Sequence, residues 1–297
     1  MIGQEFYGRQ HDLSAEIYEH AHYNTLTSLS PEDQCEIRSA GGKGAGNFLL
    51  TPTKPEFRMA DTHFTVALRA RLRLQHPACN DDISKATTHC QHRARNGELC
   101  GTPLDDHTRH AERCVKGGAI LAGHNAVRDW LDKYLKENTG HPTATEQYVP
   151  QWDRTRTIRN SDGTTTQTVE RARLDNSFTD TKGQRTHVDC VVTCSSTSNQ
   201  REQCIRAQVD GRAAQAAEVE KARRYKRSDN PHEALVAFAV ESRGRVGEEA
   251  MGLIKAVAPT EPSLRTAVIQ DAYQSLSVVI QHRIAEILLS AEQNASC

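Results

Sequence analysis

Four potential metal ligands lie close together in one polar stretch of the chain. They are Cys90, Cys100, His110 and Cys114, in the spacing Cys-x9-Cys-x9-His-x3-Cys. A stretch this polar cannot bury an apolar core, so another interaction has to order it. A tetrahedral zinc ion held by three thiolates and one imidazole would do so. The spacing therefore predicts a structural zinc module with these four residues as ligands.

The residues between the ligands support this interpretation. Asn96-Gly97 lies between the first two cysteines and predicts a two-residue hairpin turn, which would bring their thiols together. His110 and Cys114 have a spacing that suits one helical turn or a tight loop. His107 competes for the third place, but we favour His110 because its spacing to Cys114 is the more usual one. The alternative is a set of scattered reduced cysteines, since the first spacing is longer than that of a Cys-x2-Cys knuckle.

Length and composition limit the size of the core. The chain has 297 residues, of which 37% are hydrophobic and 5% aromatic, and its mean hydropathy is -0.66. One large domain or two small ones with a modest core fit these values. The net charge of -1 gives no global argument for a nucleic-acid partner, so such a contact has to come from local patches.

The sequence also bears on where the protein acts. No apolar run reaches the roughly 18 to 20 residues of a membrane helix, and the N-terminus lacks the basic start and apolar stretch of a signal peptide. Nine cysteines, an odd number, indicate thiol or metal chemistry in a reducing compartment. We expect an intracellular protein with no membrane partner.

Basic residues are concentrated in two places. Residues 59–74 are predicted to form a helix with Phe64, Leu68 and Leu72 on an apolar face and arginines on the opposite one. A second basic run lies within residues 221–227. Patches of this kind are candidates for contact with nucleic-acid phosphates. Their candidate phosphate ligands are Arg69, Arg71, Arg73, Arg223, Arg224 and Lys226.

Hydrophobic periodicity after residue 117 predicts a mixed helix-and-sheet core. The expected order is helix, three strands, helix, strand and helix, which places the chain in the α/β (α+β) class. Helices are expected over 119–138, 207–227, 248–257 and 264–291. Strands are expected over 147–152, 172–178, 186–194 and 234–241, the last as a central strand, with a turn at 160–163 between the polar arms 154–159 and 164–170.

We divide the chain into four segments. Residues 1–58 form a polar N-terminal segment that ends in a flexible glycine-rich linker at 41–46, whose spacing is not that of a P-loop. Residues 59–116 hold the basic helix and the zinc module. Residues 117–258 form the core domain, and residues 259–297 a C-terminal amphipathic helix.

Two aspartates stand at matching positions on neighbouring predicted strands. Asp175 and Asp189 flank a segment long enough for a hairpin that returns the second beside the first. Two close carboxylates repel each other, and Mg²⁺ relieves that repulsion while lowering the pKa of its bound water. Lys221 and Tyr225 lie one helical turn apart, where the lysine suits a water or phosphate and the tyrosine a sugar-phosphate backbone. Glu146 is a weaker accessory candidate.

A structural interpretation competes with the catalytic one. Asp175 suits a turn, and Lys221 suits a solvated helix face. Asp189 argues against this interpretation, because an acid inside an otherwise apolar strand is costly to bury without a purpose. The acid pair is therefore kept as a candidate magnesium site.

Together these residues resemble a known family. The chain is similar to the C-terminal region of non-LTR retrotransposon ORF proteins, in which a Cys-Cys-His-Cys zinc motif precedes a restriction-endonuclease-like domain of the PD-(D/E)xK type. Gly117-Gly118 and His124-Asn125 follow the zinc motif at the head of the next helix. The other matching positions, within about residues 45–258, are Arg173-Leu174-Asp175, Asp189–Thr193, Lys221–Tyr225 and Phe238–Glu241.

The resemblance implies a fold, an activity and a set of site residues. It implies a core of order αβββαβα over residues 117–258, and a Mg²⁺-dependent endonuclease that nicks DNA to leave a 3′-hydroxyl for reverse transcription. Asp175 and Asp189 would hold Mg²⁺, and Lys221 would assist the attacking water. His124 and Glu146 would be accessory residues. The two basic patches would contact phosphates of DNA and of element RNA, in the nucleus.

Three features depart from the family pattern. Leu174 replaces the motif proline, and the lysine lies on the helix, since Val191 stands two residues after Asp189. The chain also lacks the paired aspartates after an aromatic residue that mark a reverse transcriptase. We therefore expect a fragment, a separate tail or a decayed copy of an element. The alternative function is a catalytically inactive, zinc-containing nucleic-acid-binding remnant.

Overall fold

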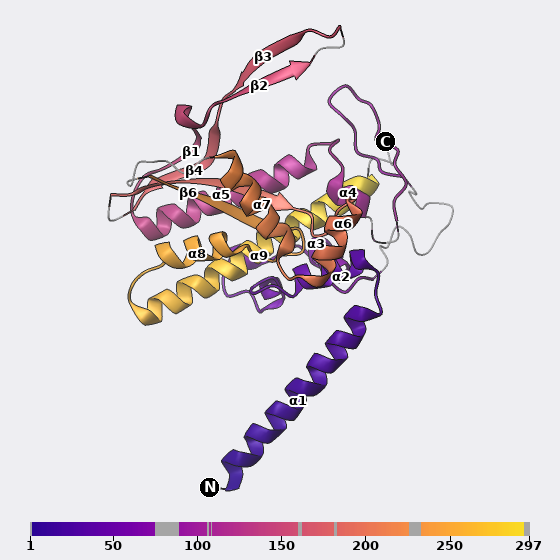
Figure 1. Ribbon diagram of the computed structural model, residues 1–297. Helices are drawn as coiled ribbons and strands as arrows, with labels where there is room; N and C mark the ends of the chain where they lie inside the picture. Colours follow the sequence, from indigo (N-terminus) through magenta and orange to yellow (C-terminus); the bar gives the residue numbers. More distant parts are fainter. Residues whose placement is uncertain are drawn as a thin grey trace.

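The computed structural model describes residues 2–74, 89–105, 107, 109–159, 162–180, 183–225 and 233–293. Within them the protein is a mixed helix-and-sheet molecule, with helices on both faces of a four-stranded sheet (Figure 1). The predicted class, α/β (α+β), is confirmed at this level. No helix in the described part of the chain has the length and apolar character needed to cross a membrane.

The central sheet is built from β1 (Thr143–Tyr148), β4 (Arg173–Thr179), β5 (Arg185–Thr193) and β6 (Glu233–Glu241). Their order in the sheet is β1-β4-β5-β6. β4 pairs antiparallel with both β1 and β5, and β5 pairs parallel with β6. A parallel pair needs a long crossover, and here helices provide it.

Helices pack on both faces of this sheet. α5 (Ala119–Thr139) and α8 (Glu248–Val257) contact one face, and α7 (Arg212–Arg224) contacts the other. α9 (Pro262–Gln293) packs against α5. The main core lies between α5, α8, α9 and the sheet. Its large buried side chains include Val127, Leu131, Leu135, Phe178, Val188, Phe238, Ile254 and Leu276.

The sequence of α5 explains why it covers the sheet. Its apolar residues recur every three or four positions, so Val127, Leu131 and Leu135 lie on one buried face. Glycines in the left-handed conformation bound the helix, with φ of 73° at Gly118 and 65° at Gly140. These glycines place both ends where the sequence predicts them.

The described part of the helix predicted over 207–227 falls in two helices, with residues 207–208 at the end of α6 (Gln200–Gln208) and most of the rest in α7 (Arg212–Arg224). α6 begins earlier than expected, with the Asn199 side chain accepting a 3.1 Å hydrogen bond from the Glu202 amide. α7 begins after Gly211, whose φ of 72° turns the chain sharply. The break is short and lies between two polar, alanine-containing segments, so helical periodicity conceals it.

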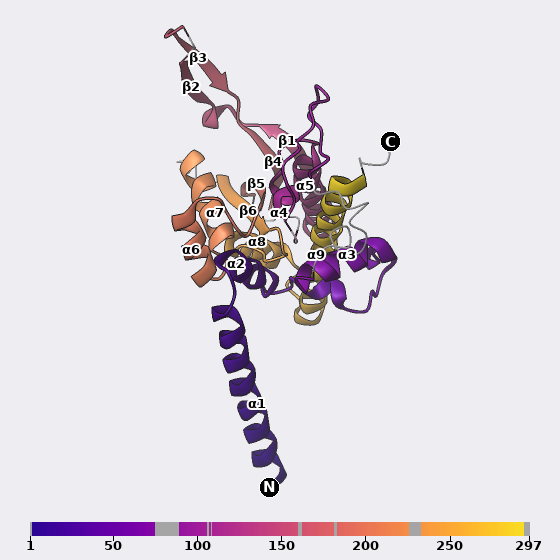
Figure 2. The same ribbon diagram turned by 90° about the vertical axis from the view of Figure 1, so that its right-hand side faces the viewer.

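Between β1 and β4 the chain forms a separate two-stranded ribbon. Its strands β2 (Arg154–Arg159) and β3 (Thr165–Glu170) pair antiparallel with each other and, among the described residues, with no other strand. Figure 1 and Figure 2 both show the ribbon extending away from the helices. The strand predicted at 147–152 lies earlier in the chain. β1 spans Thr143–Tyr148, and η4 (Pro150–Trp152) is a 3-10 turn. Proline lacks the amide hydrogen that a strand ladder needs.

β6 is buried although it stands last in the strand order. The apolar run at 234–241 predicts a central strand, but within the described sheet β6 pairs only with β5. Its apolar character has another cause: α7 and α8 both pack against it. Side chains on both of its faces are buried, including Phe238 and Ala239.

The N-terminal segment is helical and partly packed. α1 (Ile2–Thr27) projects away from the rest of the molecule (Figure 1, Figure 2), and α2 (Pro31–Ala40) packs against α6. The glycine-rich stretch 41–46, interpreted above as a flexible linker, is in contact with the body. A Cβ atom at Gly42 would lie 2.6 Å from the Arg245 side chain, and Ala45 is fully buried. Glycine here permits close approach of two chain segments.

The remaining short elements are η1 (Asn47–Leu49), η2 (Pro55–Phe57), α3 (Asp61–Arg71) and α4 (Arg109–Arg113). α3 packs against α9 and buries Val66 and Ala67, whereas Leu72, predicted on the apolar face, is exposed. α9 also contacts α4 and α5. The C-terminal helix therefore joins the zinc-ligand region to the core.

Candidate metal centres

The four predicted zinc ligands come together in the structure. One donor atom from each of Cys90, Cys100, His110 and Cys114 lies within 4.8 Å of the other three, and Cys100 Sγ is 3.2 Å from His110 Nε2. With Zn–S distances of about 2.3 Å, neighbouring donors in a tetrahedral site are roughly 3.5 to 3.8 Å apart. The donor set and its spacing are therefore suited to zinc, with His110 and not His107 in the third place.

A hairpin-like arm brings the first two cysteines together. Cys90 and Cys100 each donate their amide to a carbonyl across the arm, at 2.8 Å in both cases. The turn is closed by a bond from Ala94 N to Glu98 O, so the loop has three residues and not the predicted two. Gly97 adopts a φ of 82°, the left-handed position that such loops require.

The surroundings of the thiols set their protonation. Burial raises the pKa of Cys90 to about 12 and also raises the pKa of Cys114. The Thr102 hydroxyl, 3.3 Å from Cys100 Sγ, lowers the pKa of Cys100 to about 6. Zinc binds thiolates, so its binding displaces the protons of the two buried thiols and strengthens as pH rises.

The zinc-ligand region is docked on α9. His92 Nε2 lies 3.1 Å from Ser290 Oγ, and Gln91 N donates to Ala291 O at 3.2 Å. Ala111 of α4 is fully buried in an apolar cluster with side chains of α9. Ordering of the zinc ligands is therefore coupled to packing of the C-terminal helix.

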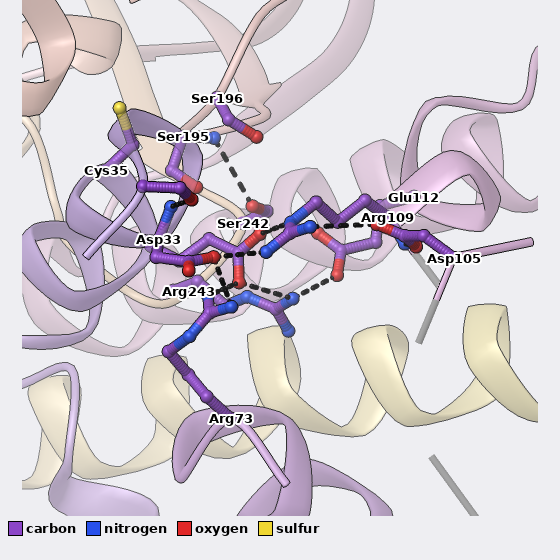
Figure 3. Close-up of polar contacts among 12 residues, drawn as sticks. Asp33, Cys35, Arg73, Asp105, Arg109, Glu112, Ser195, Ser196, Ser242 and Arg243 are labelled. Atoms are coloured by element: carbon purple, nitrogen blue, oxygen red, sulfur yellow. Dashed lines mark hydrogen bonds and ion pairs between the residues drawn. The ribbon is translucent and has the colours of Figure 1, made fainter. Parts of the chain in front are cut away.

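A buried ion-pair network holds α4, which carries His110. Figure 3 shows Arg243, from the turn after β6, meeting Glu112 of α4. Arg243 Nη2 lies 2.5 Å from Glu112 and 3.5 Å from Glu36 of α2. Arg109 Nε donates to Glu36 at 2.8 Å. Charged residues that are far apart in the sequence thus fix the short helix beside the zinc ligands.

Arg73 belongs to this network and not to an exposed basic face. It contacts Asp33 and Glu36, the latter at 2.7 Å, and only 12% of its side chain is exposed (Figure 3). Arg71 is half-buried, and burial lowers the pKa of its guanidinium. Arg69 also has an interaction within the protein. The prediction of an exposed phosphate-binding face is therefore corrected for Arg73, and phosphate contact by Arg69 and Arg71 stays a prediction.

Asp175 and Asp189 lie side by side across β4 and β5. The antiparallel register pairs Asn176 with Val188, so the next position along the two strands sets Asp175 against Asp189. Opposed residues of an antiparallel pair share one face of the sheet. Both side chains are largely buried, with 10% and 7% exposed. The predicted hairpin that returns the second acid beside the first is confirmed.

Each carboxylate has a basic side chain beside it. Lys221 Nζ on α7 lies 2.7 Å from Asp189 Oδ2. Asp175 Oδ2 accepts a 2.7 Å hydrogen bond from Cys190 N and lies 3.2 Å from His124 Nε2 on α5. Two helices thus each deliver one base to the pair, and both bases are residues that the sequence singled out.

Burial and mutual repulsion perturb the titration of the pair. Burial and the charge of Asp175 raise the pKa of Asp189 to about 6, against the attraction of Lys221. Burial acts in the same direction on Asp175 and is the largest single effect there. The hydrogen bond and charge of His124, together with hydrogen bonds from Asp189 and Cys190 N, outweigh it and lower the pKa of Asp175. The hydrogen bond with Asp175 raises the pKa of His124. The pair therefore holds one firm carboxylate and one that retains its proton more readily.

Tyr225 is buried and not presented to a bound backbone. It is 3% exposed, and its ring packs against Trp152 with 5.7 Å between centroids. Trp152 also meets His187 edge-on at 5.4 Å. Burial, with the charge of Asp189, raises the pKa of Tyr225 to about 12. The predicted contact with a sugar-phosphate backbone is corrected: Tyr225 packs behind the acid pair.

Glu146 lies opposite Asp175 but is engaged elsewhere. The β1–β4 register, which pairs Thr145 with Asn176, sets Glu146 against Asp175 at the next position. Its φ of 52° is unusual for a residue other than glycine and interrupts the ladder. Its carboxylate accepts a 2.6 Å hydrogen bond from Arg128 Nη1. The Glu146 carboxylate, predicted as an accessory group of the magnesium site, is therefore paired with Arg128.

The second basic patch is also partly engaged. Arg224 pairs with Glu170 of β3 at 2.5 Å. Arg223 pairs with Glu220 at 2.7 Å but keeps 79% of its side chain exposed, so it remains accessible to a ligand. Lys226 lies outside the described residues.

A second group of metal-type side chains is formed by His63, His282 and Glu286. The two imidazole rings are stacked, with 4.3 Å between centroids and 4° between planes. The lone pairs of ring nitrogens lie in the ring plane, so parallel stacked rings direct them side by side and not toward one ion. Arg283 also contacts Glu286. This geometry is that of a packed histidine pair.

A cavity of about 730 Å³ lies between α5, α9 and the segment around η2. Trp130 contributes to its apolar wall, and charged side chains surround it. Neither Asp175 nor Asp189 borders this cavity. Lys221 and His124, the two bases beside the acid pair, keep 19% and 26% of their side chains exposed.

Fold and sites define a mixed helix-and-sheet protein with a Cys3His cluster suited to zinc and a buried Asp-Asp-Lys group on its sheet. No protein-family model matches the sequence, and no curated protein matches it significantly.

Proposed function

We propose that this chain is a zinc-stabilised, Mg²⁺-dependent DNA endonuclease module of non-LTR retrotransposon origin. The observation that carries the proposal is the meeting of Asp175, Asp189 and Lys221 beside one another, from two strands and a helix. The element order also supports it. With the β2–β3 ribbon and α6 treated as insertions, α5, β1, β4, β5, α7, β6 and α8 follow the αβββαβα order of a restriction-endonuclease-like core.

The acid pair suits a hard divalent cation. Asp175 and Asp189 are oxygen donors held at one level of the sheet, and their repulsion contributes to the raised pKa of Asp189. When bound there, Mg²⁺ supplies Lewis acidity for a water nucleophile and for a phosphoryl group under in-line attack. Both aspartates would hold the ion.

The protein side chains have distinct roles in this proposal. Cys190 N and His124 Nε2 both contact Asp175 through Oδ2, and its other oxygen would be available to the ion. Lys221 neutralises Asp189 in the protein alone, and a cation on the acid pair would free it to contact the scissile phosphate or orient the water. His124 is a positioning residue, because it acts on Asp175.

The alternative is a zinc-containing nucleic-acid-binding remnant without catalysis. The burial of the two aspartates favours it, since only 10% and 7% of their side chains are exposed. Lys221 already supplies Asp189 with a counter-charge, so the two can form a purely structural ion pair. In this case the protein binds nucleic acid but does not cleave it.

Nicking of supercoiled plasmid DNA distinguishes the two functions. Asp175→Asn and Asp189→Asn are expected to lower the Mg²⁺-dependent nicking rate by about 100-fold or more, the scale on which one electrostatic active-site group acts. Asp12→Asn, at an exposed position on α1, is the matched control and is expected to nick as wild type does. Zinc content, measured by atomic absorption, should be equal in all proteins. Normal nicking by Asp189→Asn would overturn the assignment, and plasmid binding without cleavage by the wild type would favour the remnant.

A further inference from the structure

The β2–β3 ribbon is exposed on both of its faces. Every residue of both strands is exposed, and cross-strand pairs from Arg154↔Glu170 to Arg159↔Thr165 run along its whole length. It stands clear of the helices in both views (Figure 1, Figure 2). A two-stranded hairpin without a buried face is only marginally stable in water and adds little to a core. Packing therefore does not account for the ribbon.

The base of the ribbon is anchored beside the acid pair. The ribbon is inserted between β1 and β4, and the turn that leads into it carries the buried Trp152. Trp152 packs on Tyr225, which in turn lies next to Asp189. Asp153 accepts a 2.8 Å hydrogen bond from Ala172 N, which closes the base. A molecule held by the ribbon is thus held at a defined place relative to the acid pair.

The acids of the ribbon are engaged, whereas two of its arginines are free to bind a ligand. Glu170 forms an ion pair with Arg224 at 2.5 Å, and Asp162 accepts a 2.9 Å hydrogen bond from Thr164 N. Arg154 and Arg156 alternate along β2 and so lie on the same face of the ribbon. Both are exposed, and in the described part of the chain neither has an ion-pair partner. Glu170 lies on this face too, opposite Arg154, but Arg224 pairs with its charge, so the face keeps a net positive charge.

The size and chemistry of this face fit duplex DNA. Strands of this length make a ribbon of about 20 Å. The major groove of B-DNA, about 12 Å wide, admits a two-stranded ribbon. Thr166 and Thr168 of β3 share the face with Arg154 and Arg156, and both residue types are frequent phosphate ligands. A single strand offers no such groove.

We propose that the β2–β3 ribbon is a DNA-gripping arm, which lies in the major groove of duplex DNA with the Arg154 and Arg156 side chains on backbone phosphates. The inference deepens the proposed function and rests on it for DNA as the partner, but not for the chemistry at Asp175 and Asp189. The arm holds the duplex while the neighbouring acid pair faces one strand.

Duplex binding in Mg²⁺-free buffer tests the arm without cleavage. Fluorescence anisotropy of a labelled duplex is expected to give a Kd about 10-fold weaker for the double variant Arg154→Gln, Arg156→Gln. The slope of log Kd against log salt is expected to fall by about 2, because each lost phosphate contact removes about 0.9. The matched control is Lys133→Gln, Lys255→Gln, which removes the same charge from exposed positions on α5 and α8 and is expected to bind as wild type does.

A second variant removes the arm itself. Replacing residues 155–169 with an Asn-Gly turn joins Arg154 to Glu170, which already face each other as a cross-strand pair. It is expected to lose at least as much affinity while keeping its zinc content and the helical signal of its far-UV circular dichroism. Wild-type affinity in both variants would overturn the proposal of a DNA-gripping arm. Competition for the labelled duplex by single-stranded DNA or RNA as effective as that by duplex DNA would overturn it too. If arm variants lose affinity and the wild type never nicks, the arm stands and the nuclease function fails.

Discussion

Replacing Asp189 with asparagine is expected to stabilise the protein against unfolding at neutral pH in the absence of Mg²⁺. Burial and the charge of Asp175 raise the pKa of Asp189 from 3.8 to about 6, against Lys221. The folded state therefore binds this proton more tightly than the unfolded state does. The stabilisation is full below about pH 4 and is lost as the pH rises to about 6 and above. Asparagine resembles the neutral carboxyl group at every pH.

The magnitude follows from the difference between the two pKa values. They differ by about 2 pH units, and each unit corresponds to about 1.4 kcal/mol, so ionised Asp189 destabilises the fold by about 3 kcal/mol above pH 7. At pH 5, where Asp189 is only partly ionised in the folded state, the same calculation gives a destabilisation of about 1.6 kcal/mol. Only 7% of the side chain is exposed, so solvent screening does not cancel the effect.

Urea unfolding of the two proteins at pH 8 and pH 5, in zinc-containing buffer without Mg²⁺, measures this difference. The free energy of unfolding of Asp189→Asn is expected to exceed that of the wild type by about 3 kcal/mol at pH 8 and by about half as much at pH 5. Added Mg²⁺ is expected to stabilise the wild type and not the variant, because a ligand of the folded state adds to stability. A variant less stable than wild type at pH 8, or a gain that grows on acidification, would refute the reasoning.

Two further predictions concern the framework around the acid pair. Cys114→Ser is expected to abolish stoichiometric zinc binding, measured by atomic absorption. Cys204→Ser, which changes an exposed thiol outside the cluster, should retain zinc. Zinc retention by Cys114→Ser would contradict the ligand set. Arg243→Met leaves Glu112 and Glu36 buried without their shared cation, and urea unfolding should show a loss of about 3 to 5 kcal/mol. A loss below about 1 kcal/mol would show that the network does not hold α4.

Sequence predicted the zinc-ligand cluster because its signals are local. The ligands are separated by short loops, and Gly97 fixes the turn that joins the first two. The length of that turn was wrong by one residue, since Asn-Gly pairs occur both in two-residue loops and in longer ones that end in a left-handed glycine. Ligand identity is insensitive to this error because Cys90 and Cys100 still meet.

The position of the acid pair was also predictable. Residues on two strands of a hairpin meet when they are equidistant from the turn, and Asp175 and Asp189 satisfy this condition. Lys221 was predicted to join the pair from the following helix, and its Nζ lies beside Asp189. Tyr225 was misjudged, because an aromatic residue near the end of a basic helix can face solvent or core, and only the position of Trp152 decides between them.

Long-range charge pairing was the main feature that sequence did not reveal. Arg73 lies in an arginine-rich segment, just after the end of α3, and its acidic partners Asp33 and Glu36 lie on α2, far away in the sequence. A basic run has the same sequence whether its side chains meet phosphates or buried carboxylates. The Arg243–Glu112 pair, which joins two predicted segments, was missed for the same reason. A hint was available in Arg243 itself, a charge directly after a continuous apolar strand.

The most direct test of the proposed function is the fate of supercoiled plasmid DNA incubated with the full chain and Mg²⁺. We predict conversion to the open circle, with a 3′-hydroxyl at the nick that a DNA polymerase extends. The conversion should require Mg²⁺ and should be slower by about 100-fold or more with Asp189→Asn. Plasmid that the protein binds but leaves supercoiled at every Mg²⁺ concentration would contradict the nuclease assignment.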